Sequence, residues 1–159
     1  MTSSPLPGVH AEQGSVAARD AAGIWARATA RRDQLQVVPP LDDKLPGIES
    51  ALALDGALLL MVRVRERAMA FSIVVPKLEV LEVLYLAVDS EAWGTGFARK
   101  LLDHLKCHSV KVQTPMELWV IAENKRAIAA YERAGWIPTS DVKVRNSAGR
   151  PERRYMLSL

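Results

Sequence analysis

Two glycines mark a turn at which the sequence changes from a strand pattern to a helix pattern. Residues 84–88 are typical of a strand, whereas the apolar positions after Gly96 recur at helical spacing. Gly94 and Gly96 carry no side chains, so backbone N–H groups can converge on an anion there, and the helix N-terminus adds partial positive charge. The segment predicts a phosphate-binding turn; the alternative is a pair of glycines that only makes the turn tight.

Turns of this kind bind two classes of ligand, dinucleotides and coenzyme A. The dinucleotide fingerprint requires a third glycine, and the sequence has Arg99 at that position, although Glu123 can stand in for the acid that binds the ribose. The strands before the turn form a meander, and the chain after Gly96 is too short to complete a doubly wound sheet. Coenzyme A is therefore the favoured ligand.

The elements that must position this turn are expected to form one mixed α/β domain over residues 9–159, after a flexible lead-in at residues 1–8. Periodicity and capping residues predict helices at 15–34 with Ser15 as N-cap, at 46–53 with Pro46 in the first turn, at 96–108, and from Asn124 to Gly135. Branched residues and turn signals predict strands at 9–12, 57–65, 68–75, 81–88, 117–122, 141–145 and 154–159.

Composition places the chain among globular proteins with one core. Of its 159 residues, 49% are hydrophobic and 25% are charged, which excludes a disordered or fibrous chain. The net charge of +3 is small for a nucleic-acid binder, and an anionic small ligand explains it as well as RNA does. The single cysteine, Cys107, excludes an internal disulfide and favours a cytoplasmic location, and neither a signal peptide nor a membrane span is expected.

Two blocks of the sequence occur in an order that is typical of one family. The first reads Trp93-Gly94-Thr95-Gly96-Phe97-Ala98, and the second runs from Asn124 through Tyr131 to Gly135 and Trp136. They resemble the pyrophosphate-loop signature Gln/Arg-x-x-Gly-x-Gly/Ala and the block Asn-x-x-Ala-x-x-x-Tyr-x-x-x-Gly-Phe/Trp of the GNAT superfamily of acyl-CoA-dependent N-acyltransferases. One position departs from the signature, because Trp93 replaces the usual Arg or Gln; Arg99 or Lys100 is then expected to add positive charge.

The resemblance implies the GNAT fold, an α/β fold with a central, mostly antiparallel sheet, splayed parallel fourth and fifth strands, and about four flanking helices. It implies acetyl-CoA as the co-substrate and no metal. The contacts that it implies for coenzyme A are Leu86, Ala87, Val88, Trp93, Gly94, Thr95, Gly96, Phe97, Ala98, Arg99, Asn124 and Tyr131.

The resemblance also implies roles for two catalytic residues. Tyr131 is the expected general acid, which protonates the leaving sulfur; the alternative is a tyrosine that only packs on its helix. Glu82 is the expected general base, acting directly or through water, because even spacing along a strand places it on the same face as Val88. Glu79 is an alternative base, and Glu82 can equally be a solvated edge charge.

His104 and His108, with Cys107 between them, are spaced like a helical zinc pair, but no third ligand is evident and a metal site is not expected. The predicted function is transfer of acetyl from acetyl-CoA to a primary amine of a small molecule. Alternatives are acetylation of a protein N-terminus or lysine, and a non-catalytic CoA-binding sensor, for which Trp93 is the motivating feature. No membrane partner is expected, nucleic acid is disfavoured, and a homodimer is left open.

Overall fold

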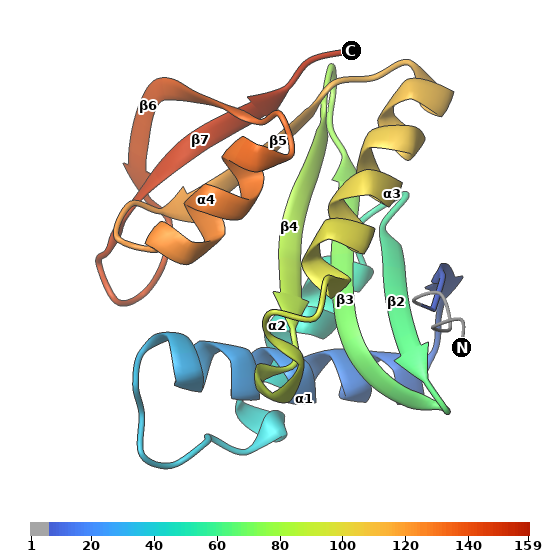
Figure 1. Cartoon of the computed structure of the whole chain (residues 1–159), viewed down its shortest axis with the longest axis vertical. Helices are drawn as coiled ribbons and strands as arrows, with labels where there is room; N and C mark the ends of the chain where they lie inside the picture. The colour runs from blue at the N-terminus through green and yellow to red at the C-terminus, as the bar shows by residue number, and fades with distance from the viewer. Residues whose placement is uncertain (1–6) are drawn as a thin grey trace, which may run out of the picture.

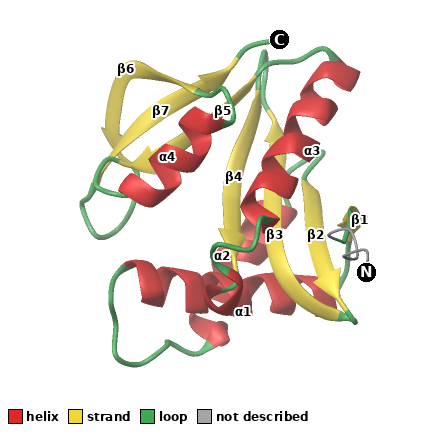
Figure 2. Ribbon diagram, viewed as in Figure 1, coloured by secondary structure: helices red, strands yellow, loops and turns green. Residues whose placement is uncertain are grey.

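A seven-stranded sheet, in the order β1-β2-β3-β4-β5-β7-β6, runs through the molecule with helices on both faces (Figures 1 and 2). The computed structural model describes residues 7–159, so the lead-in expected at residues 1–8 lies mostly outside the described residues. The elements are β1 Val9–Glu12, α1 Ser15–Arg32, α2 Leu41–Leu52, β2 Leu58–Val64, β3 Arg67–Pro76, β4 Leu81–Val88, the short 3₁₀ helix η1 Ser90–Ala92, α3 Phe97–Val112, β5 Met116–Ile121, α4 Lys125–Arg133, β6 Ile137–Val144 and β7 Pro151–Leu157.

Two hydrophobic cores lie on the two faces of the sheet. On the face covered by α1 and α2, which we call the α1 face, Ile24 packs with Phe71 and with a row of small residues along α1. On the face covered by α3 and α4, the α3 face, Leu101 packs with Tyr131 and Trp136. Along β2 and most of β3, alternate residues enter one core or the other, as the period of a strand dictates. No helix within residues 7–159 is both long and apolar enough to cross a bilayer.

The parallel strands β4 and β5 separate after a short stretch of pairing. They pair only from Leu81 opposite Met116 to Val83 opposite Leu118, although β4 continues to Val88. Beyond that point Figure 1 shows β5 turning away from β4 toward β7. The divergence confirms the splayed fourth and fifth strands implied by the resemblance. It also leaves backbone N–H and C=O groups of the two facing edges available to a ligand.

A β-bulge in β4 reverses the alternation of its side chains. Ile73 of β3 lies opposite Tyr85 while Val74 lies opposite Val83, so Leu84 is an extra residue in β4. Val83, before the bulge, therefore faces the α3 core, and Val88, after the bulge, faces the same core. In a regular strand, two residues separated by an odd number of positions would face opposite sides. The expectation that Glu82 and Val88 share a face is wrong for this reason, because even spacing holds only in a strand without a bulge.

Each predicted element is present, and the differences lie at the ends. The second helix begins five residues before Pro46, because Pro40 fixes its start and two aspartates favour its first turn, so Pro46 lies inside the helix. Gly14, with φ of 103°, is the N-cap of α1 in place of Ser15. At α4 the prediction is confirmed: Asn124 Oδ1 accepts the N–H of Ala127 at 3.3 Å, and Gly135 follows with φ of 94°.

A buried ion pair fixes the loop after β4 to helix α1. Arg27 donates two hydrogen bonds to Asp89 Oδ2, at 3.0 and 2.7 Å, and the Asp89 side chain is 0% exposed. Asp89 Oδ1 also accepts the N–H of Glu91 at 3.2 Å and so caps η1. This one carboxylate therefore holds the start of the glycine turn against the α1 face.

We expect Asp89→Ala to destabilise the fold by about 2–3 kcal/mol, because Arg27 loses its buried partner while remaining partly hydrated. A loss of this size lowers Tm by roughly 5–10 °C in a domain of this length. Asp103→Ala is the matched control, since Asp103 pairs with Arg99 at 3.1 Å on the surface and such pairs contribute little. Equal Tm values for the two variants in thermal unfolding would contradict the anchoring role.

Candidate active site

The gap between β4 and β5 holds a cavity of about 680 Å³, the main cavity. Its walls come from both faces of the sheet: Trp25, Thr29 and Arg32 of α1 on one side, and Ala127 and Tyr131 of α4 on the other. The cavity therefore passes through the sheet where β4 and β5 no longer pair. Two reactants can enter such a cavity from opposite faces and meet within it.

The glycine turn borders the main cavity at the N-terminus of α3. Gly94 and Gly96 have φ of 83° and 94°, values in the left-handed region that glycine adopts without strain. No side chain caps the first turn of α3, so its backbone N–H groups are available to an anionic ligand. This geometry can accept an anion such as a pyrophosphate.

Trp93, the residue that departs from the family signature, has a defined structural role. Its indole Nε1 donates to the Val88 carbonyl at 2.9 Å and ties the turn to the end of β4. The guanidinium carbons of Arg31 and Arg126 each lie 4.3 Å from the centroid of its ring. Cation–π contact thus holds two positive charges beside the turn. Arg126 lines the main cavity and forms no ion pair with any residue of 7–159.

Tyr131 reaches the main cavity from the α3 face. The residue is 8% exposed, and burial raises the pKa of its phenol to about 12. Its hydroxyl takes part in no hydrogen bond with residues 7–159, although the ring packs 6.3 Å from that of Trp136. The phenol is therefore protonated throughout the physiological range and free to donate into the cavity.

The residues predicted to contact coenzyme A gather around the main cavity with one exception. Every one of them lines it except Thr95, whose hydroxyl donates to the Ala92 carbonyl inside the turn. Arg99 lines the cavity but pairs with Asp103 on the surface. Arg126 is therefore better placed than Arg99 to add the positive charge that Trp93 does not supply.

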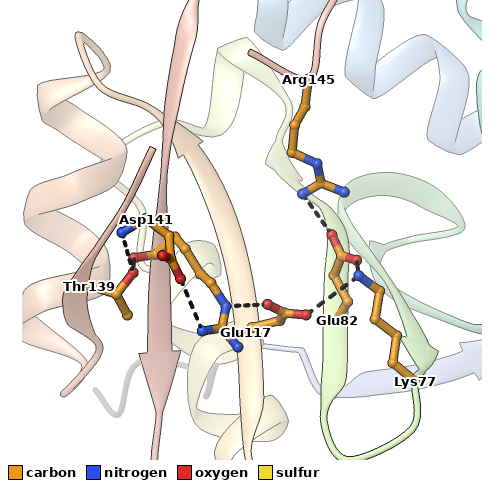
Figure 3. Close-up of polar contacts among 7 residues, drawn as sticks. Lys77, Glu82, Glu117, Thr139, Asp141 and Arg145 are labelled. Atoms are coloured by element: carbon orange, nitrogen blue, oxygen red, sulfur yellow. Dashed lines mark hydrogen bonds and ion pairs between the residues drawn. The ribbon is translucent and has the colours of Figure 1, made fainter. Parts of the chain in front are cut away.

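Glu82 lies outside the lining of the main cavity. It is 2% exposed and points to the α1 face, where Lys77 pairs with Oε1 and Arg145 donates to Oε2 at 3.0 Å (Figure 3). Glu117 is its neighbour in register on β5. The bulge and these two cations fix the position of the Glu82 side chain. Residue spacing alone reveals neither of them.

Glu117 extends the same ion-pair network toward β6 and β7 (Figure 3). Arg154 donates to Glu117 at 2.5 Å and also pairs with Asp141 at 3.4 Å, while Lys77 reaches Glu117 at 3.4 Å. Burial alone would raise the pKa of Glu117, but the hydrogen bond from Arg154 and the charge of Lys77 hold it below its ordinary value. The network joins β4, β5, β6 and β7 beside the main cavity.

Several lining residues were not predicted as site residues. Tyr85 and Trp25, whose rings meet edge to face at 5.0 Å, bound the cavity on the α1 face, and Trp119 and Glu152 bound it on β5 and β7. Their spacing carries no signal, because they meet only once the sheet has formed. Among residues 7–159, no three His, Cys, Asp or Glu side chains gather as a metal site would require.

The sequence matches the profile of the acetyltransferase (GNAT) family over residues 28–136. The chain therefore belongs to this family and is an acyl-CoA-dependent N-acetyltransferase, as the two sequence blocks indicated. No curated protein matches it.

Solved structures share the fold at low sequence identity. The ribosomal-protein-S18-alanine N-acetyltransferase of Escherichia coli superposes with a TM-score of 0.75 at 20% identity, with 97% of this chain and 96% of that one covered. An aminoglycoside 6′-N-acetyltransferase complexed with coenzyme A gives 0.71 at 12% identity, covering 93% and 94%. An acetyltransferase of Bacillus subtilis in complex with CoA gives 0.68 at 10%, covering 96% and 99%.

We expect Arg126→Ala to weaken CoA binding about 5- to 20-fold, because the guanidinium lies beside Trp93 in the cavity lining, where it would meet the phosphates of the ligand. Pantetheine, which lacks phosphates, should bind both proteins equally. Calorimetric titration measures both affinities. Lys125→Ala is the control, since it removes the same charge from an exposed neighbour outside the cavity lining. A parallel loss of pantetheine affinity would show that Arg126 shapes the cavity rather than binding phosphate.

Proposed function

We propose that this enzyme transfers the acetyl group of acetyl-CoA to a primary amine of a small molecule. One observation carries the proposal: a single cavity connects the anion-binding turn after β4 with an aromatic-lined recess on the α1 face. Trp25, Tyr85 and Trp119 bound that recess, which suits an acceptor small enough to be enclosed.

The residues around the turn fit coenzyme A. Backbone N–H groups of the segment from Gly94 to Ala98 and the Arg126 guanidinium would hold the pyrophosphate, and the free edge of β4 from Leu86 to Val88 would hold the pantetheine arm. Bound acetyl-CoA supplies a thioester, whose acyl carbon is open to direct attack by an amine.

Tyr131 is the proposed general acid. Its phenol holds a proton at Oη because its pKa is raised to about 12 by burial, and no described residue competes for that proton. A donor of this kind protonates the leaving sulfur as the thioester bond breaks.

Glu82 is the proposed general base. It lies on the α1 face, which is the face from which the acceptor would approach. Since both of its carboxylate oxygens are engaged by Lys77 and Arg145, removal of the proton from the acceptor would pass through water.

Two further assignments belong to the proposal. The single cysteine fits a reducing compartment, and we assign the enzyme to the cytoplasm. Acetylation of a protein N-terminus or lysine is the alternative activity, and a non-catalytic CoA sensor is the alternative class. A peptide acceptor would have to reach the same cavity from the α1 face.

We expect thiol release from acetyl-CoA when the protein is mixed with a panel of small primary amines, and little release with peptides. In Tyr131→Phe the ring packing stays and the proton donor is lost, so kcat should fall about 10- to 1000-fold while CoA affinity is nearly unchanged. Since the phenol titrates near pH 12, it should cause no loss of wild-type activity up to about pH 10.

The same panel separates the alternatives. A wild-type protein that binds CoA in a thermal-shift assay but acetylates no amine would favour the sensor. A preference for peptides would favour the protein acetyltransferase, and an unchanged kcat in Tyr131→Phe would make Tyr131 a packing residue.

Glu82→Gln should reduce turnover most near neutral pH, where the acceptor amine is protonated, and a rise in pH should restore part of the rate. The control is Lys77→Gln, which breaks the ion pair with Glu82 but leaves the carboxylate in place. If the two variants lose Tm and activity alike at every pH from 6 to about 9, the carboxylate holds the strands and is not the base.

A further inference from the structure

The main cavity is lined by a single carboxylate, that of Glu152, within the part of the chain that the structure describes. The other charged residues of the lining are Arg32, Arg99, Arg126 and Arg133. Arg126 and Arg99 lie with α4 and α3 near the anion-binding turn. Glu152 lies at the start of β7, in register with Ile121 at the end of β5.

Glu152 faces the α1 side of the cavity. Tyr155 and Leu157 of β7 enter the core on the α3 face, so Glu152 and Arg154, at the intervening positions of an unbulged pairing with β5, face the other side. Asn146 Nδ2 donates to Glu152 Oε2 at 3.0 Å and to the Arg150 carbonyl at 2.7 Å. The side chain is thus held in place by a neutral amide.

The hairpin that carries Glu152 is fastened to helix α1. Arg150 pairs with Asp33 at 2.8 Å, and Asp33 also pairs with Arg32 at 3.0 Å. The hydrogen bonds from Arg32 and Arg150 lower the pKa of Asp33 to about 2. Arg32, which also lines the cavity, therefore pairs with a carboxylate other than that of Glu152.

Two other cations on this face pair with carboxylates other than Glu152, and Lys143 contacts an aromatic ring. Arg154 pairs with Glu117 and Asp141, and Arg145 pairs with Glu82. Lys143 is opposite Glu152 in the β6–β7 register, but its Nζ lies 5.4 Å from the centroid of the Trp119 ring and forms no ion pair with residues 7–159. No ion pair within the described chain uses the Glu152 carboxylate, so its charge is available to a ligand.

Given the proposed function, on which this inference rests, we propose that Glu152 binds a positively charged group of the acceptor other than the amine that is acetylated. The acceptor class is then a diamine or polyamine. An amine held as ammonium by a carboxylate is not a nucleophile, so the cation at Glu152 is the non-reacting one. The aromatic rings of Trp25, Tyr85 and Trp119 suit the apolar segment between the two nitrogens, and aromatic faces also attract cations.

The charge distribution of the cavity supports the binding of a cation at Glu152. Unpaired Arg126 and the α3 N-terminus lie beside the turn that suits the phosphates of coenzyme A, and unpaired Glu152 lies on the face left for the acceptor. The cavity thus presents positive charge to an anionic ligand on its α4 wall and negative charge to a cationic ligand on its β7 wall. Glu152 is a positioning residue in this account and takes no part in proton transfer.

The test compares 1,4-diaminobutane, 4-aminobutan-1-ol and 4-aminobutanoate, three acceptors of equal length whose second group is positive, neutral or negative. We expect kcat/KM of the wild type to be about tenfold higher for the diamine than for the amino alcohol, and lowest for the amino acid. Glu152→Gln keeps an oxygen to accept the Asn146 hydrogen bond but removes the charge. It should bring the diamine and the amino alcohol within about twofold of each other, through KM rather than kcat.

Glu49→Gln, which removes a charge from the exposed part of α2, is the control and should keep the wild-type preference. Tm and CoA affinity of Glu152→Gln should match those of the wild type and so show that the variant folds. Loss of diamine preference confined to Glu152→Gln supports the inference. A wild type without diamine preference, or a variant that retains it, overturns the inference while amine acetylation itself stands.

Binding of the diamine can be measured without turnover. Calorimetric titration of 1,4-diaminobutane into the CoA-saturated protein should show an affinity that falls about tenfold in Glu152→Gln and weakens with salt. If no amine is acetylated, the proposed function fails, and this titration still decides whether Glu152 binds the cation. Equal diamine affinity in wild type and variant would overturn the inference.

Discussion

The end of pairing between β4 and β5 is the constraint on which the rest of the structure depends. Parallel strands that stay paired leave no room for a ligand, whereas strands that separate expose polar backbone groups that must be satisfied. Here the pairing lasts only to Val83 and Leu118. The main cavity, the placement of Tyr131 above it and the access from two faces all follow from that separation.

Ion pairs stabilise β4 and β5 over the short stretch in which the two strands pair. Glu82 and Glu117 lie opposite each other one residue before the pairing ends, and like charges in such positions repel. Lys77 contacts both carboxylates, while Arg145 and Arg154 bring opposing charge from the β6–β7 side. The positive charges that hold the sheet together on one face are distinct from those beside the glycine turn, so cofactor binding need not disturb them.

Local patterns predicted the elements and many of the residues that line the main cavity around the glycine turn. The glycine turn, the cap at Asn124 and the spacing of Tyr131 are signals within short segments, and each lies where it was expected or one residue away. The part of the lining on the α1 face could not be predicted in the same way. Trp25, Tyr85 and Glu152 come from three distant segments, and only the sheet order brings them together. The stacking of Arg31 and Arg126 on Trp93 is likewise a tertiary contact with no sequence period.

The bulge at Leu84 has a consequence for comparisons within the family. A strand with one extra residue exchanges the faces of all positions on one side of it. Two family members that differ in this bulge would thus present an aligned glutamate to opposite sides of the sheet. In one the carboxylate would meet the substrate, and in the other it would serve only as a fastening between strands. The position of a glutamate in an alignment of β4 therefore does not determine its chemical role. A single insertion or deletion in the strand could bring a catalytic group to the substrate or take it away, without any change in residue type.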